Sequence, residues 1–535
     1  MSTRPYTLTL AKAAQILTEH HLLREIIRGE QWASDPYALP DADTPFTALT
    51  YDTRQISADS LLFIKGRFRP EYLRDADDLG LAAYVAESAY DECTQSTGLI
   101  VQNVHKAMCL LAAAYYGNPE RDLTMIGITG TKGKTTTAYL THAILNEYSH
   151  GKAALSSSLH TCVDGKTFTP SHLTTPESLD AFRMMRTAVD NGMRYLVMEV
   201  SSQAYKVHRV HGITFDIGAF LNISPDHISD IEHPTFEDYL YSKRRLIANS
   251  RTLILGADST HIDLLTQDAK QYHTPTTTFA LHDPETGHLT HANVLATPDE
   301  QDSSRFTLSV DGTTIDGGSQ EPMKLAMAGS FNELNAAAAA AIALHAGVQP
   351  HDPAMRAMQN VQVPGRMERF GSGNLIAYVD YAHNYLSTKT LVDEIGHHFA
   401  ERNPRIILVS GSTGGKAIDR REGIVKAAEG KVSSYYFTMD DPNREDPQSI
   451  AEEMRSYVKD PEAITHVVLP RERAVEEALQ EAAQYAENRL NIVLVIGKGS
   501  ETANVVNGKR IPYEGDANVV RRMLKTLHIP NDFND

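Results

Sequence analysis

A glycine-rich stretch near residue 130 constrains the fold of this chain more than any other feature. The run Gly127-Ile128-Thr129-Gly130-Thr131-Lys132-Gly133-Lys134-Thr135-Thr136 connects an apolar segment, Leu123–Ile128, to a segment with helical spacing, Thr135–Tyr148. A strand, a glycine-rich turn and a helix N-terminus in this order cradle phosphate, because their backbone N–H groups converge on an anion. The pattern predicts an open α/β sheet with a phosphate-binding loop.

Two side chains in this loop carry the expected chemistry. Lys134 is predicted to place a positive charge on the outer phosphates, and Thr135 to offer a hydroxyl to Mg²⁺. The strict P-loop spacing would have a glycine at Ile128, so this loop is a variant. A tight strand–helix connection without a ligand is the alternative, and Gly-Lys-Thr at the helix start argues against it.

Composition restricts the class of protein. A chain of 535 residues is longer than a domain with a single hydrophobic core usually is, so several domains are expected. The net charge of −18 argues against a nucleic-acid partner. Three cysteines without a close pair indicate neither a disulfide framework nor a zinc site. The chain has no N-terminal signal pattern and no apolar run near the roughly 20 residues that span a bilayer, so we expect a cytoplasmic protein without membrane insertion.

The strand pattern predicts three α/β domains, at residues 1–118, 119–362 and 363–535. The first is small, the second is a doubly wound sheet that contains the phosphate loop, and the third alternates strands with helices as in a Rossmann-like sheet. Within the second domain, Thr276–Gly318 is predicted to be a small antiparallel insertion, because its hydrophobic residues alternate.

Polar residues follow two further predicted strands of the second domain. Tyr195–Val200 contains Glu199, and Ile217–Leu221 leads into Asp226-His227. Ligands bind beyond the carboxyl ends of such strands. Glu199 is therefore a candidate Mg²⁺ ligand, with an exposed strand-end glutamate as the alternative. His227 is equally compatible with a metal ligand and with an ordinary loop histidine.

A phosphate loop indicates nucleotide binding but not its use. An ATP-driven ligase, an NTPase switch or motor, and a non-enzymatic nucleotide-gated binding protein all remain possible. The third domain also has polar clusters at its strand ends, which favours the ligase, because two facing sites could close on one another.

Five motifs in order resemble those of the Mur ligases, the ATP-dependent amino-acid ligases of peptidoglycan synthesis. The resemblance covers essentially the whole chain. It is greatest to the members that extend UDP-N-acetylmuramoyl-L-alanyl-D-glutamate by its third residue, and it implies one domain for the UDP end, one for ATP and one for the amino acid. We expect a monomer. The motifs are Gly130-Thr131-Lys132-Gly133-Lys134-Thr135-Thr136, Glu199-Val200-Ser201-Ser202, Asp226-His227, Gly365-Arg366-Met367-Glu368 and Asp380-Tyr381-Ala382-His383.

The resemblance also implies roles for individual residues. Lys243 matches the carbamylated lysine of the family, although its position alone indicates a helix-surface charge. The implied catalytic residues are Lys134, Glu199, His227 and Lys243, and the metal ligands are Thr135, Glu199, His227 and the carbamate of Lys243. The implied ATP-binding residues are Gly130, Thr131, Lys132, Gly133, Lys134, Thr135, Thr136, Asn335, Arg366 and Asp380. The implied dipeptide-binding residues are Thr53, Thr174, Thr175, Ser202 and Arg209, and those for the amino acid are Arg421, Asp440, Asp441, Asn443 and Glu501.

One difference from the family pattern indicates which amino acid is added as substrate. Members that add meso-diaminopimelate carry Asp-Asn-Pro-Arg, whose arginine binds the extra carboxylate, whereas this chain has Asp440-Asp441-Pro442-Asn443. Arg444 is displaced by one residue, and the loop is acidic, which suits the ammonium of L-lysine. We therefore predict L-lysine, with meso-diaminopimelate as the alternative.

The sequence argues against two alternative functions. A folylpolyglutamate synthetase shares the phosphate loop and the modified lysine, but the N-terminal domain and Thr174-Thr175-Pro176 argue against it. A catalytically silent paralogue is disfavoured because Lys134, Glu199, His227 and Lys243 are all present.

Overall fold

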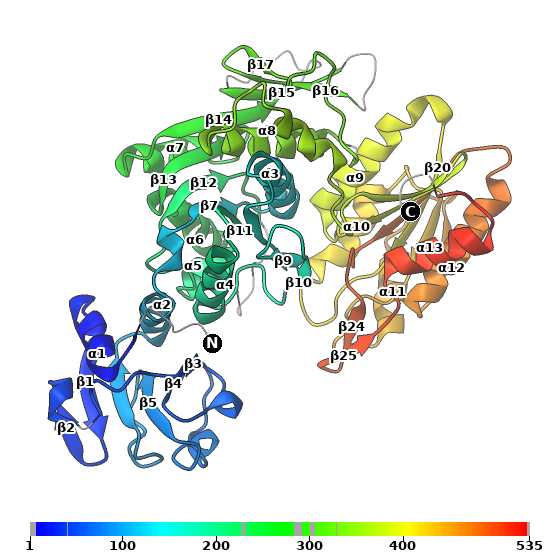
Figure 1. Cartoon of the computed structure of the whole chain (residues 1–535). Helices are drawn as coiled ribbons and strands as arrows, with labels where there is room; N and C mark the ends of the chain where they lie inside the picture. Colours follow the sequence, from blue (N-terminus) through cyan, green and yellow to red (C-terminus); the bar gives the residue numbers. More distant parts are fainter. Residues whose placement is uncertain are drawn as a thin grey trace.

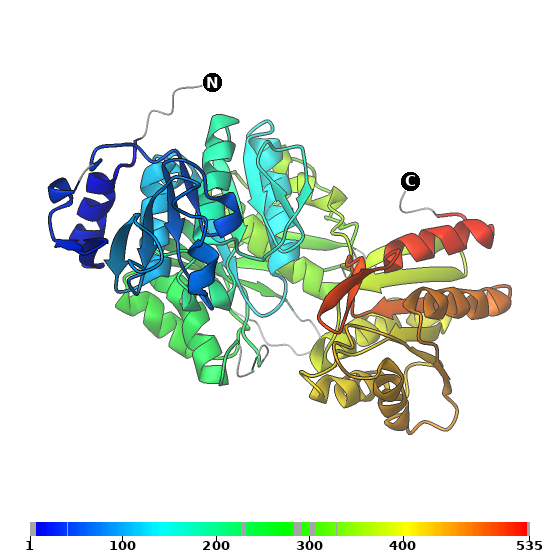
Figure 2. The same ribbon diagram turned by 90° about the horizontal axis from the view of Figure 1, so that it is seen from below.

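The chain forms three large sheets in sequence, which appear as three lobes in Figure 1. The computed structural model describes residues 7–39, 41–225, 228, 232–282, 292–299, 305–327 and 329–531. Seen from below in Figure 2, the first and third lobes lie at opposite ends, with the central lobe between them. The predicted α/β class is confirmed.

The first sheet has six strands in the order β2-β1-β6-β5-β4-β3, of which β3 to β6 are parallel. The apolar runs at residues 61–64, 83–86 and 99–101 predict three strands in this lobe, and β4, β5 and β6 confirm them. One face packs against helices α1 and α2 in a core that continues into the central lobe. The elements are α1 (Leu10–Glu19), β1 (Leu23–Arg28), β2 (Gln31–Ala33), β3 (Ala48–Thr50), β4 (Ser60–Phe63), β5 (Leu81–Ala86), β6 (Thr97–Val101) and α2 (Val104–Tyr115).

The central lobe contains an eleven-stranded sheet in the order β10-β9-β8-β11-β7-β12-β13-β14-β15-β16-β17. Its elements are β7 (Thr124–Thr129), α3 (Lys134–Tyr148), β8 (Ala153–Ser156), β9 (His160–Cys162), β10 (Thr169–Pro170), α4 (Ser178–Asp190), β11 (Tyr195–Glu199), α5 (Ser202–Lys206), β12 (Phe215–Phe220), α6 (Phe236–Ala248), β13 (Ser250–Gly256), α7 (Ile262–Gln271), β14 (Thr276–Leu281), β15 (Val294–Pro298), β16 (Phe306–Val310), β17 (Thr313–Ile315) and α8 (Ser330–His345). The strands from β8 to β15 in this order, through β11, β7, β12, β13 and β14, pair in parallel.

Helices α3 and α8 cover the same face of this sheet and lie side by side in Figure 1. The alanine run of α8 is fully buried, and its small side chains let the helix lie close to α3. On the other face, α4 shares a core with α2 of the first lobe.

The prediction of a separate antiparallel insertion at Thr276–Gly318 is wrong in part. Strand β14 pairs in parallel with β13, and β15 in parallel with β14, so both extend the central sheet. Only β16 and β17 are antiparallel. Alternation of hydrophobic residues reveals a half-buried strand but does not specify the direction of its partner.

The third sheet has the order β18-β19-β23-β20-β21-β22, parallel except for β18. Helices α9, α10 and α11 pack on one face, and α12 and α13 on the other. The elements are β18 (Glu368–Ser372), β19 (Leu375–Asp380), α9 (Tyr385–His398), β20 (Arg405–Ser410), α10 (Asp419–Ala428), β21 (Ser434–Phe437), α11 (Pro447–Ser456), β22 (Ile464–Val467), α12 (Arg471–Tyr485), β23 (Asn491–Ile496), a hairpin of β24 (Ala503–Val506) and β25 (Lys509–Pro512), and α13 (Asp516–Thr526).

A buried ion pair joins α12 to α13. The Arg471 guanidinium donates Nε and Nη2 to the two oxygens of Asp516 at 2.8 Å, and both side chains have no exposed area. We expect Asp516→Asn to destabilise this lobe by about 3 kcal/mol, because it leaves a buried cation without its countercharge. Hydrogen-exchange mass spectrometry of β20 and β23 measures the loss. Glu477→Gln, which breaks an exposed pair on α12, is the control and should cost below about 0.5 kcal/mol. Equal effects would contradict the prediction.

Candidate active site

The glycine-rich loop connects β7 to α3, as its sequence predicts. Gly133 caps α3 with φ +83°, and a Cβ atom there would collide with the side-chain oxygen of Asn335 from α8. Glycine is therefore required both by the left-handed backbone and by the close approach of a neighbouring helix. The N–H groups of the first turn of α3 are directed at the space above the loop, where an anion is favoured.

Lys134 folds back over this loop. Its Nζ donates to the carbonyl oxygens of Gly130 at 2.8 Å and Thr131 at 3.1 Å. Thr131 is held in turn by Ser224 and by the hydroxyl of Tyr239, which donates to it at 3.2 Å. The lysine is thus placed beside the backbone that would cradle phosphate.

Lys243 lies on α6 and is only 2% exposed, so the interpretation as a surface charge is wrong. Its Nζ donates to the same Gly130 carbonyl at 2.8 Å and lies 4.9 Å from the centre of the Tyr239 ring. The face of α6 that carries Lys243 packs toward the sheet. The structure therefore brings two lysine nitrogens together on one carbonyl oxygen.

Glu199 ends β11 and is fully buried, which excludes the alternative of an exposed strand-end glutamate. Its two oxygens accept hydrogen bonds from the N–H and hydroxyl of Ser158, at 2.8 and 3.0 Å. Ser158 also lies 3.1 Å from the hydroxyl of Thr174. Sequence reasoning missed Ser158, because it is distant in the chain from the strand that it serves.

Two of the predicted dipeptide residues of the central lobe are in contact, because Nη1 of Arg209 donates to the Thr175 carbonyl at 3.4 Å. Thr175 donates to the carbonyl of Glu199 at 2.9 Å, and Arg209 pairs with Glu177 at 2.8 Å. Lys65 of the first lobe pairs with the same glutamate at 3.0 Å. The site is thus lined by charged groups from two lobes.

Thr53 belongs to the first lobe and lies two residues after Tyr51, which contacts the central lobe. It begins a short 3-10 helix, Thr53–Gln55, which Asp52 caps. The hydroxyl of Tyr51 donates to Asp180 of α4 at 2.5 Å, which holds this segment against the central lobe. Arg54 is exposed and pairs with Asp52, as expected of a surface arginine.

Arg366 and Asp380 lie in the third lobe. The Arg366 guanidinium stacks over the ring of Tyr381, 4.5 Å from its centre. Asp380 accepts hydrogen bonds from the backbone N–H groups of Met367 and Ala382, at 2.8 and 2.7 Å, and so holds the turn that carries Arg366.

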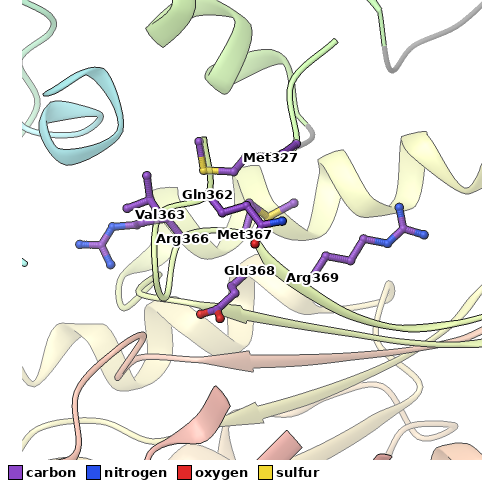
Figure 3. A pocket seen from close by; sticks show the side chains of 8 residues that line it. Met327, Gln362, Val363, Arg366, Met367, Glu368 and Arg369 are labelled. Atoms are coloured by element: carbon purple, nitrogen blue, oxygen red, sulfur yellow. The ribbon is translucent and has the colours of Figure 1, made fainter. Parts of the chain in front are cut away.

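A cavity of about 10 Å³ lies where this turn meets the end of the central lobe. Figure 3 shows Arg366 and Arg369 extending away from each other on either side of it. A space of this size holds no more than a water molecule, so it is part of the junction and not a ligand pocket.

An acidic cluster surrounds Lys498 at the carboxyl end of the third sheet. Lys498 is 1% exposed and pairs with Asp441 at 2.8 Å and with Glu501 at 2.6 Å, while Asp440 lies 3.9 Å away. Burial raises the pKa of Asp440 to about 6, although the cations of Arg471 and Lys498 act in the opposite direction. Three of the predicted amino-acid residues therefore converge on one cation.

Arg421 is buried and held by two glutamates. Its guanidinium pairs with Glu445 and with Glu453, each at 2.6 Å. A substrate carboxylate that bound Nη1 or Nη2 of this arginine would displace one of these glutamates.

Asn443 has a structural role in its loop. Its backbone is left-handed, with φ +54°, a conformation that asparagine adopts more readily than most residues. Its Nδ2 donates to the carbonyls of Gly414 at 2.8 Å and Asp441 at 3.0 Å. Arg444, the next residue, is exposed.

Asp226 and His227 lie outside the described residues, so the prediction for His227 is not examined by the structure. Within the described ranges, no group of three or more His, Cys, Asp and Glu side chains is placed to hold a metal ion. The predicted metal set differs from such a group, because it combines a hydroxyl, one carboxylate, a modified lysine and His227. No helix in the described part of the chain is both long and apolar enough to cross a membrane.

Comparisons with known proteins match most of the chain. A family model of the Mur ligase middle domain matches residues 128–343, and a model of the Mur ligase glutamate ligase domain matches residues 365–499. A UDP-N-acetylmuramyl-tripeptide synthetase from Bifidobacterium longum is 52% identical over 97% of this chain and 99% of its own length. A UDP-N-acetylmuramoyl-L-alanyl-D-glutamate–L-lysine ligase from Enterococcus faecalis is 39% identical over 95% of this chain and 97% of its own. The solved structure of a UDP-N-acetylmuramoyl-L-alanyl-D-glutamate–2,6-diaminopimelate ligase superposes with a TM-score of 0.64 at 20% identity, over 98% of this chain and 99% of that one.

Proposed function

Because this chain belongs to the Mur ligase family of ATP-dependent, amide-bond-forming ligases, we propose that it adds L-lysine to UDP-N-acetylmuramoyl-L-alanyl-D-glutamate in peptidoglycan precursor synthesis. The observation that carries the choice of amino acid is the acidic cluster of Asp440, Asp441 and Glu501, with Asn443 where an arginine would serve diaminopimelate. The L-lysine ligase from Enterococcus faecalis, 39% identical, supports it.

Each lobe takes one part of the reaction in this proposal. Residues 1–118 bind the UDP end, 119–362 bind ATP, and 363–535 bind the amino acid. The three large sheets fall within these three ranges. ATP and a UDP-linked precursor place the reaction in the cytoplasm, where the protein would act as a monomer and contribute to cell shape and division.

The first step transfers a phosphoryl group. A carboxylate oxygen of the dipeptide attacks the γ-phosphorus of ATP, the bond to the bridging oxygen breaks, and ADP leaves with an acyl phosphate remaining on the dipeptide. Lys134 neutralises the charge that shifts between these oxygens, and the N–H groups at the start of α3 hold the phosphates.

The residues present fit a Mg²⁺ site and a carbamylated Lys243. Thr135 and Glu199 offer the oxygen ligands that Mg²⁺ prefers, and Ser158 orients the carboxylate. Two lysine nitrogens on the Gly130 carbonyl repel one another, and carbamylation of Lys243 would replace one cation by an anion. Thr135, Glu199, His227 and the carbamate would hold Mg²⁺, which supplies charge neutralisation to the phosphates when bound.

The second step forms the amide bond. The α-amine of lysine, after losing a proton, attacks the acyl carbon, and the tetrahedral intermediate collapses with release of phosphate. Arg421 would bind the lysine carboxylate in place of Glu445 or Glu453. The lysine ε-ammonium would join the acidic cluster around Lys498.

ADP release in the presence of the UDP-dipeptide tests the proposal, with L-lysine, meso-diaminopimelate and ornithine compared. We expect kcat/KM for L-lysine to exceed that for diaminopimelate by at least about 100-fold, because the extra carboxylate would be buried among acidic groups. Equal or better use of diaminopimelate would contradict the choice of lysine, and no ADP release with any amino acid would contradict the function.

Variants of the loop that contains Asn443 and Arg444 test the same choice of amino acid more directly. Asn443→Arg should erode the preference for lysine, and Asn443→Ala is its matched control, because both lose the hydrogen bonds to Gly414 and Asp441 but only one adds a cation. Arg444→Ala should leave selectivity unchanged, because Arg444 is exposed. If wild type uses diaminopimelate and Arg444→Ala abolishes that use, the register of the loop is wrong.

A further inference from the structure

A buried histidine that sequence reasoning did not single out links two polar residues beside the predicted dipeptide site. His233 has no exposed area, and its Nε2 lies 2.9 Å from the hydroxyl oxygen of Ser202. Its Nδ1 lies 2.6 Å from Oδ2 of Asp238 in the first turn of α6. Ser202, His233 and Asp238 thus form a continuous hydrogen-bonded chain, which we name the serine–histidine relay.

The surroundings of the relay hold the ring in one orientation. The His233 ring packs edge-on against Tyr239, with centroids 5.3 Å apart. Lys206 pairs with Asp238 at 2.8 Å and also donates to the backbone carbonyl of Glu232 at 2.7 Å. Among the residues that the structure describes, Asp238 and Glu232 favour protonation of the imidazole and Lys206 opposes it.

The donor and acceptor groups of the three side chains determine the direction of the hydrogen bonds in the relay. The Asp238 carboxylate only accepts, so Nδ1 of His233 carries a proton. In a neutral ring Nε2 is then an acceptor, and the Ser202 hydroxyl must donate its single proton to it. Ser202 has no second proton, so in this state it offers only lone pairs to a ligand.

A substrate carboxylate requires the opposite arrangement, because it can only accept hydrogen bonds. When His233 takes up a proton, Nε2–H donates to the Ser202 oxygen, and the hydroxyl proton becomes free to point at the ligand. We propose that His233 is a positioning residue that makes Ser202 a donor to a dipeptide carboxylate by taking up one proton when the dipeptide binds. This inference rests on the proposed function, which makes a carboxylate-bearing dipeptide the ligand of Ser202.

The direction of the pH dependence follows from the environment of the ring. Burial lowers the pKa of His233 below its ordinary value, although Asp238 acts in the opposite direction, and this favours the neutral ring in the free protein. A bound carboxylate raises the pKa of His233 in the complex. Between these two pKa values dipeptide binding takes up a proton, and the affinity therefore falls as the pH rises, by at most about tenfold per pH unit.

The experiment measures KM for UDP-N-acetylmuramoyl-L-alanyl-D-glutamate from pH 6.5 to 8.5, together with proton uptake on dipeptide binding, from calorimetry in buffers of different ionisation enthalpy. In wild type we expect KM to rise at least fivefold over this range, with proton uptake at pH 7.5. His233→Gln keeps an N–H donor for Ser202 but cannot titrate, so its KM should be independent of pH and its proton uptake zero. Ser202→Ala should also lose both effects.

His142→Gln is the matched control. His142 is likewise a buried histidine of the central lobe, 5% exposed, but it bonds to the backbone carbonyl of Ala153 and not to a predicted substrate residue. It should keep the wild-type pH dependence. If His233→Gln does not fold, as judged by circular dichroism, Ser202→Ala decides.

The possible failures are distinguishable. A KM that is flat with pH in wild type, or a rise that persists in His233→Gln or Ser202→Ala, overturns the relay while amino-acid-dependent ADP release remains normal. Loss of the rise in His142→Gln also overturns it. Absence of ADP release from wild type at every pH instead overturns the proposed function.

Discussion

Replacing Lys134 by alanine is expected to lower kcat for ADP release by about 10³-fold, or about 4 kcal/mol in the transition state. The Lys134 Nζ lies on the carbonyls of Gly130 and Thr131, at the start of α3, where the outer phosphates of ATP would bind. Charge on these phosphate oxygens shifts most during transfer, so the loss should exceed the loss of ground-state ATP affinity. Steady-state kinetics at saturating ATP, with separate measurement of ATP binding, give both quantities.

Lys152→Ala is the matched control for Lys134. Lys152 is exposed and precedes β8, at the opposite edge of the sheet from the carboxyl ends where Lys134 lies. Its replacement should leave kcat within about twofold of wild type. A Lys134→Ala protein that binds ATP weakly but turns over normally at saturating ATP would contradict the catalytic role.

Replacing Lys243 by alanine is expected to abolish turnover without unfolding the protein. If Lys243 carries a carbamate, its loss removes an anionic metal ligand and leaves Glu199 as the one carboxylate among the predicted ligands, at a cost of at least about 10³-fold in kcat. The folded state should tolerate the change, because the buried nitrogen that is removed shares its acceptor carbonyl with Lys134. Turnover, melting temperature and the mass of the modified peptide are the measurements.

Chemical rescue distinguishes a carbamate from an ordinary cation. Short carboxylates such as formate should partly restore the activity of Lys243→Ala, and they should not restore Lys134→Ala, which lacks a positive charge. Lys270→Ala, on the neighbouring helix α7, serves as the control and should be as active as wild type. Full activity of Lys243→Ala in bicarbonate-free buffer would exclude the carbamate.

The sequence alone was sufficient for features that depend on near neighbours in the chain. The apolar run before the phosphate loop forms β7, and the helical spacing after it forms α3. The strand that ends at Glu199 is also where the hydrophobic pattern places it. Local sterics and burial set these elements, so a single sequence is enough to predict them.

Tertiary packing alone decided which side chains meet at the site. The position of Lys243 alone predicts a surface charge, because a helical period does not say which neighbour covers each face of the helix. Asn335 meets Gly133 only because α8 packs beside α3, more than two hundred residues later in the chain. Arg421 is held by two glutamates that follow it in the chain, Glu445 in the loop before α11 and Glu453 on α11.

The serine–histidine relay shows most clearly why tertiary packing, and not sequence spacing, decides which polar side chains meet. The sequence places Ser202 just after the predicted strand that contains Glu199, whereas the structure shows that Ser202 begins α5 and that Asp238 lies in the first turn of α6. Their connection through His233 depends on the packing of α5 against α6, which brings a hydroxyl, an imidazole and a carboxylate within 3 Å contacts. Hydrogen bonds act over such short distances that only the folded chain, and not the spacing of residues along it, decides which polar groups share a proton.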